Sequence, residues 1–242
     1  MPGERSVLQK RLNEIKTYTE IHQLKINERK TKIMSFNFSR KFDFLPKFFF
    51  GDNELEVVHS IKLLGVIISD DLKWNEHTLY IVKKAKQRLW TLRRLSRLGA
   101  SRDTLLNQYH LMIRSIEEMG APVFTGGLSK TNIDDIEQVQ KGAFKIILKG
   151  DYINYESALT TLGEKTLEQR RADIALKFAK TCVSHPKMSH LFQKSKNERT
   201  RSGETCFFET QFNSARGFNG PISYLIRLLN DNMGKIRYTD QL

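Results

Sequence analysis

The chain has 242 residues, 39% of them apolar and 28% charged, which is enough for one large domain or two small ones. This composition excludes a collagen-like fibre, a disulfide-dense scaffold and a wholly disordered chain. The 40 lysines and arginines outnumber the 27 acidic residues and give a net charge of +13. A charge of this size favours a polyanionic partner, most often a nucleic acid.

The sequence also argues against membrane and secreted proteins. No stretch approaches the ~18 uncharged apolar residues of a membrane span, and residues 1–30 contain no apolar secretory core. We therefore expect an intracellular protein, cytoplasmic or nuclear and not secreted, without a membrane partner. Cys182 and Cys206 are accordingly expected to be free thiols. The sequence contains no glycine-rich phosphate-binding loop and no Gly-x-Ser-x-Gly nucleophile elbow, and no small-molecule substrate is evident.

The first part of the chain is predicted to combine one helix with short strands. Apolar periodicity predicts a helix over residues 6–22, with Ser6 as its N-cap. Residues 51–53, Gly-Asp-Asn, predict a tight turn between two strands, and Gly65 lies inside a later apolar run. The predicted strands occupy residues 32–38, 48–50, 55–58 and 61–69.

After Trp74 the pattern becomes helical. Gly99 and Gly150 stand where the residue after a helix C-terminus belongs, and Ser101, Asn132 and Thr166 are suitable N-caps. The predicted helices span residues 77–98, 102–119, 132–149, 153–162, 167–184 and 222–233.

These elements predict an α+β fold that is mostly α, arranged in three parts. Residues 1–73 form a small β-containing part, and residues 74–193 form a helical part. Residues 194–242 are predicted to be a mobile connector, rich in Lys, Arg, Ser, Asn and Gly, that leads to a C-terminal helix.

The positive charge is concentrated on one predicted helix. Residues 79–102 contain eight basic side chains and no acidic one. Projected at about 100° per residue, one face of this helix is apolar and another sector is cationic, with an indole in its middle. The apolar face consists of Val82, Ala85, Leu89 and Leu92. The cationic stripe consists of Lys83, Lys86, Trp90, Arg93, Arg94 and Arg97.

Lysine and arginine neutralise phosphates, and an aromatic ring can stack on a base. We therefore predict that the stripe binds the backbone of RNA, DNA or an RNA–DNA hybrid. The alternative is a solvated helix face whose tryptophan packs on a neighbouring element.

Two further sets of residues have metal-ligand chemistry. Asp70-Asp71 after a strand, like the Gly-Asp-Asn turn, has the form of a Mg²⁺-binding loop, but a turn or a helix start explains each equally simply. Cys182, His185, His190 and Cys206 are ligand types of zinc, but their spacing fits no common zinc finger. The sequence leaves zinc binding by this set open and predicts no metal ligand.

Four stretches, in one order, resemble the C-terminal part of the reverse transcriptase of non-LTR, LINE-type, jockey-like retrotransposons. Residues 24–36, LKINERKTKIMSF, are similar to palm motif D. Residues 62–74, KLLGVIISDDLKW, with His77 after them, resemble the segment that begins at motif E, the primer grip. Residues 109–159 resemble the thumb, and residues 167–171 and 221–230 recur near the ends of such elements.

This resemblance implies a palm remnant with a small antiparallel sheet over residues 1–73, followed by a thumb-like helical bundle. It implies motif D-like roles for Asn27, Lys30 and Thr31, and primer-grip-like roles for Leu64 and Gly65. The parent family is an RNA-directed DNA polymerase that uses Mg²⁺. Its Tyr/Phe-Ala-Asp-Asp motif precedes the first helix there and does not occur in these 242 residues.

We therefore expect no catalytic residue and no cofactor in this fragment, and nucleic-acid binding as its remaining activity. Two alternatives stay open. One is a helical protein-interaction module without a nucleic-acid role, and the other is a metal-dependent nuclease that uses Asp70 and Asp71.

Overall fold

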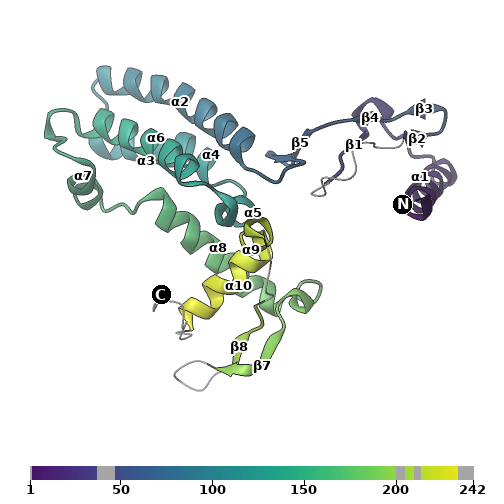
Figure 1. Ribbon diagram of the computed structural model, residues 1–242. Coiled ribbons are helices and arrows are strands. Elements are labelled where there is room, and N and C mark those ends of the chain that lie inside the picture. Colours follow the sequence, from purple (N-terminus) through teal and green to yellow (C-terminus); the bar gives the residue numbers. More distant parts are fainter. Residues whose placement is uncertain (1, 37–46, 200–204, 210–213, 234–242) are drawn as a thin grey trace. The chain divides into compact units, whose positions relative to one another are not determined.

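The computed structural model describes residues 2–36, 47–199, 205–209 and 214–233 (Figure 1). The chain is mostly helical with small sheets, as expected for an α+β protein that is mostly α. It divides into two compact units. The first comprises Met1–Leu63 with Ile67–Leu72, and the second comprises Leu64–Val66 with Lys73–Leu242.

The first unit begins with the predicted helix. It starts at Pro2, however, so Ser6 lies inside it and is not its N-cap. Gln9 joins this helix to the strand that begins at Phe49, because its amide accepts from the Phe49 N–H at 3.0 Å and donates to the Phe49 carbonyl at 2.8 Å. The elements up to the unit boundary are α1 (Pro2–Ile21), the 3₁₀ turn η1 (Glu28–Lys30), β1 (Lys32–Ile33), β2 (Phe49–Phe50), β3 (Asn53–Glu54), β4 (Glu56–Val57), β5 (Ser60–Leu63) and β6 (Val66–Ser69).

The strands form pairs instead of the single antiparallel sheet that was predicted. The turn at Gly51-Asp52 is confirmed, and β2 and β3 are antiparallel across it, with Gly51 at φ +63°. β1 is shorter than the predicted strand, whose residues 37 and 38 lie outside the described residues, and it pairs with β4 in parallel. The expected antiparallel pairing is therefore present in small two-stranded sheets, whereas β1 and β4 pair in parallel.

The predicted strand over residues 61–69 is instead a hairpin of β5 and β6. Leu64 and Gly65 form its two-residue turn with φ values of +48° and +91°. Two consecutive positive φ values reverse the chain in the way a tight hairpin requires, and glycine adopts the second without a steric cost. The apolar run therefore folds back on itself.

The second unit contains the helices that the periodicity predicts, with boundaries shifted by a few residues. They are α2 (Asn75–Arg97), α3 (Arg102–Tyr109), the π-helical turn η2 (His110–Arg114), α4 (Ser115–Glu118), α5 (Ala121–Phe124), the 3₁₀ turn η3 (Thr125–Gly127), α6 (Lys130–Leu148), the 3₁₀ turn η4 (Lys149–Asp151), α7 (Tyr155–Leu162), α8 (Leu167–Ser184) and α10 (Pro221–Asn232). The single helix expected over residues 102–119 is thus interrupted by the π-helical turn.

In the second unit, three predicted helix-end residues are confirmed and two are wrong. Ser101 caps α3, and Thr166 caps α8 in a reciprocal capping box with Gln169. Asn132 is not a cap, because Ser129 caps α6 three residues earlier and accepts a bond from the Asn132 N–H at 3.2 Å. Gly99 has φ +84° after α2, whereas the left-handed turn after α6 falls on Lys149 and not on Gly150.

α2 and α6 pack side by side and run parallel (Figure 1). Near their N-terminal ends the Asn132 amide donates to the Asn75 side chain at 3.1 Å. Near their C-terminal ends the Ser96 hydroxyl lies 3.4 Å from the Ile146 carbonyl. The core between the helices is closed by side chains without solvent exposure. They include Ile81, Tyr109, Phe124, Ile136, Phe144 and Leu167.

The segment predicted to be a connector contains regular structure. Its described residues include β7 (Lys194–Arg199) paired antiparallel with β8 (Thr205–Phe207), after the 3₁₀ turn η5 (Ser189–Leu191), and then α9 (Ala215–Phe218). Asn230 of α10 fixes β8, since its side chain accepts from the Phe207 N–H at 2.8 Å and donates to the Phe207 carbonyl at 3.0 Å. Composition does not reveal this regular structure, because part of its support comes from a distant helix.

Candidate nucleic-acid interface

α2 separates an apolar face from a cationic one, as its sequence predicts. Val82, Ala85, Leu89 and Leu92 are buried against the bundle. Every member of the cationic stripe is exposed, namely Lys83, Lys86, Trp90, Arg93, Arg94 and Arg97. The apolar face of α2 therefore packs against the bundle, and the cationic stripe faces solvent along its whole length.

Trp90 belongs to the surface and not to the core. Its side chain is 57% exposed, and the Arg94 guanidinium lies 4.9 Å from the centre of its ring. The alternative that the indole packs on a neighbouring element is therefore not supported. An exposed ring held beside a cation can stack on a base while the cation approaches a phosphate.

The cations of the stripe are not neutralised within the described part of the chain. No ion pair joins Lys83, Lys86, Arg93, Arg94 or Arg97 to an acid among these residues. Other arginines of the same unit are paired. Arg114, for example, donates to Glu164 at 2.8 Å, and Arg170 bonds Glu118. The stripe thus retains its charge for an external anion.

Sequence reasoning missed two cations that lie beside the stripe. Lys145 of α6 and Lys149, which directly follows α6, are exposed and line a surface depression together with Arg93 and Arg97. Their spacing of four residues on one helix is visible in the sequence. Their proximity to α2 is not, since it depends on how the two helices pack.

The motif D-like residues form a compact turn in the first unit. Asn27 caps the 3₁₀ turn η1, and its side chain accepts from the Lys30 N–H at 3.2 Å. The Thr31 hydroxyl donates to the Asn27 carbonyl at 3.1 Å. The Lys30 side chain is exposed, as is that of Arg29, so the turn presents two cations to solvent.

The primer-grip-like residues lie at the tip of the β5–β6 hairpin. Leu64 is 94% exposed, which is unusual for a large apolar side chain. Gly65 lies against Met119, because a Cβ at this glycine would be 2.6 Å from the Met119 Cε. A larger residue in place of Gly65 would therefore collide with Met119 and disturb the tip of the hairpin.

The acidic pair and the thiol set do not assemble as metal sites in the described residues. Asp70 bonds His59 at 2.7 Å, and Asp71 accepts from the Ser69 hydroxyl at 2.8 Å. Within the described ranges, no group of three or more His, Cys, Asp or Glu side chains could hold a metal ion. The nuclease alternative thus lacks a third ligand beside its two aspartates there.

The thiols of the proposed zinc set are core residues. Cys182 and Cys206 are buried, whereas His185 and His190 are exposed. Burial raises the pKa of the Cys182 thiol, which opposes the thiolate form that zinc requires.

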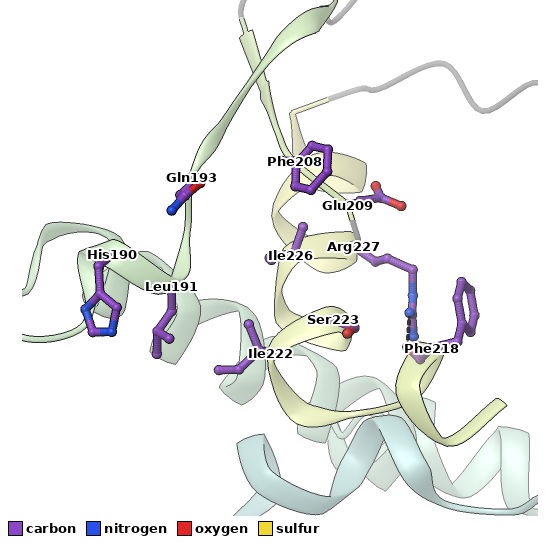
Figure 2. A pocket seen from close by; sticks show the side chains of 10 residues that line it. All are labelled: His190, Leu191, Gln193, Phe208, Glu209, Phe218, Ile222, Ser223, Ile226 and Arg227. Carbon is purple, nitrogen blue, oxygen red and sulfur yellow. Dashed lines mark hydrogen bonds between the residues drawn. The ribbon is translucent and has the colours of Figure 1, made fainter. Parts of the chain in front are cut away.

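His190 instead lines a pocket of about 370 Å³ between η5, the end of β8 and α9–α10 (Figure 2). There the Arg227 guanidinium stacks on the Phe218 ring at 3.8 Å, and Ile222 and Ile226 form an apolar wall. None of the cationic-stripe residues lines this pocket.

Comparison with protein-family models, with curated proteins and with solved structures finds no match to this chain. In the part of the chain that the structure describes, no helix has the length and apolarity to cross a membrane.

Proposed function

We propose that this chain binds the sugar–phosphate backbone of nucleic acids through the cationic stripe of α2. The observation that carries the proposal is a row of exposed cations without acidic partners, interrupted by an exposed indole. Cations of this kind give sequence-independent binding, because they contact phosphates and not base edges.

We further propose, from the resemblance described above, that the chain corresponds to the primer-grip and thumb region of a retrotransposon reverse transcriptase. Its helical second unit and the exposed tip at Leu64 are compatible with this assignment. The 242 residues contain no Tyr/Phe-Ala-Asp-Asp motif, so these residues on their own are expected to bind but not to polymerise.

Binding can be measured by fluorescence anisotropy with a labelled RNA–DNA hybrid over a range of salt concentrations. The log–log slope of affinity against salt is expected to be roughly −4 if most of the five cations contact a duplex. Replacing Arg93 and Arg94 with Ala should flatten this slope by roughly two and weaken all sequences about equally.

The control variant is Lys177→Ala with Lys180→Ala, which removes the same charge from an exposed face of α8. An equal loss in this control would show that only net charge matters. Unchanged affinity in the Arg93 and Arg94 variant would reject the stripe as the binding surface. Template-dependent primer extension by the purified chain would reject the proposal that it binds without polymerising.

The interaction-module alternative makes a different prediction for the same surface. The stripe is exposed within the described chain, so a separate acidic partner would have to cover it. A module without a nucleic-acid role should show no binding of the RNA–DNA hybrid that depends on Arg93 and Arg94, so the anisotropy assay separates the two functions.

A further inference from the structure

The C-terminal halves of α2 and α6 together carry more positive charge than either helix alone. Acidic residues are absent from positions 138–149, the C-terminal half of α6 with its cap residue, which contain three lysines, just as they are absent from α2 after Glu76. Because the helices are parallel, both acid-free halves lie at the same end of the pair. Two rows of cations are thus brought side by side.

Four of these cations surround one depression of about 370 Å³. Arg93 and Arg97 border it from α2, and Lys145 of α6 and the cap residue Lys149 border it from the other side. Ser96 and Ile146 form the remaining lining at the line of contact between the helices. The depression is therefore built across two elements.

The two lysines are held in place. The Lys149 ammonium donates to the Ser96 carbonyl at 3.2 Å, which fastens it to α2. The Lys145 ammonium lies 5.5 Å from the centre of the Tyr152 ring. The nearby carboxylate of Asp151 is engaged by Arg102 and does not neutralise either lysine.

A simpler explanation assigns these cations to the helix ends. Basic residues near a C-terminus favour the helix dipole, and Arg97, Lys145 and Lys149 have that position. One cation per helix suffices for this purpose, however. Four around one depression repel one another in the absence of an anion, and a bound anion would remove that repulsion.

We infer that this depression is a phosphate-binding subsite, and that a bound nucleic-acid strand crosses from α2 onto α6 instead of following α2 along its whole length. The inference rests on the nucleic-acid binding proposed above and adds where the backbone runs. Lys83 and Lys86, which lie towards the other end of α2, then contribute less than Lys145 and Lys149.

The experiment compares three double variants in the anisotropy assay with the RNA–DNA hybrid. They are Lys145→Gln with Lys149→Gln, Arg93→Gln with Arg97→Gln, and Lys83→Gln with Lys86→Gln. The first two are each expected to flatten the salt slope by roughly two. Raising salt from about 50 to 200 mM then weakens the wild type about tenfold more than either variant.

These variants distinguish failure of the phosphate subsite from failure of nucleic-acid binding by α2. If the Arg93 and Arg97 variant loses affinity while the Lys145 and Lys149 variant binds like the wild type, the subsite is wrong and backbone binding by α2 survives.

If the wild type does not bind the hybrid at all, both proposals fail. If the Lys177 and Lys180 control on α8 flattens the slope as much as the Lys145 and Lys149 variant, net charge explains the effect and the subsite is rejected. Circular dichroism of each variant verifies that the helices are retained.

Discussion

The two tryptophans of this chain occupy opposite environments, and their replacement should separate binding from folding. Trp90 is 57% exposed, whereas Trp74 is 7% exposed. The Trp74 ring lies 6.2 Å from the rings of both His77 and Phe124. A Cβ at Gly127 would lie 2.3 Å from its indole nitrogen, so the ring fills its site tightly.

Because one indole is exposed and the other is buried, we expect different losses of stability and of RNA affinity when each is replaced. Trp90→Ala removes one exposed cation–π contact, which stabilises by about 0.5–1 kcal/mol. The same change should weaken binding to single-stranded RNA by ~1–3 kcal/mol, or about 5- to 150-fold, if the indole stacks on a base. Trp74→Ala leaves a core cavity and should lower the free energy of unfolding by about 3–5 kcal/mol.

Urea denaturation followed by circular dichroism measures the stability of each variant, and anisotropy measures its affinity for RNA. The salt slope of Trp90→Ala should equal that of the wild type, because an indole carries no charge. In a Trp74→Phe variant, Trp90 is the sole indole fluorophore, and its emission should be quenched when RNA binds.

Two results would refute this reasoning. A stability loss in Trp90→Ala as large as that in Trp74→Ala would show that both indoles support the core. Wild-type affinity in a folded Trp90→Ala variant would show that the indole lies outside the interface, even if the neighbouring arginines bind phosphate.

Three further predictions concern stability. Burial lowers the pKa of His77 from 6.5 to about 4, so the neutral ring is favoured in the fold. Stability should fall by roughly 3 kcal/mol as pH drops through that window, and His77→Phe should abolish this loss in urea titrations. Burial raises the pKa of Glu117 well above its usual range, and the charge of Arg171 only partly opposes this. Stability should therefore decline as pH rises above 4.5, most clearly above pH 6.5 where His77 no longer titrates, and Glu117→Gln should flatten that decline. Thr166→Ala removes the bond from the Gln169 N–H at 3.2 Å, and should cost about 1 kcal/mol in the urea midpoint analysis.

The helices of the second unit could be predicted because their signals are local. The stop at Gly99, the cap at Ser101 and the capping box at Thr166 each depend on residues within one turn. The wrong cap at Asn132 has a local reason too. Ser129 is an equally good cap three residues earlier, and its choice places Asn132 where its amide reaches Asn75.

The strands were harder to predict because their pairing is decided over longer distances. The run at residues 61–69 is mostly apolar and rich in β-branched residues on both sides of Gly65, so composition alone does not distinguish one strand from two. The positive φ at Leu64, a residue that rarely adopts it, is compatible with the turn because glycine follows and the side chain extends into solvent. β1 and β4 pair in parallel, and turn residues in the sequence predict only antiparallel hairpins, so they give no indication of this pair.

The cationic surface shows the same division between local and distant information. The stripe on α2 can be predicted from the sequence spacing of its basic residues, since side chains three and four residues apart share a helix face. Its extension onto α6 depends on the parallel packing of two helices. That packing is close at Gly142, where an added Cβ would lie 3.4 Å from a methyl carbon of Leu89. The contact between α2 and α6, made here by two uncharged residues, therefore decides which cations lie beside one another.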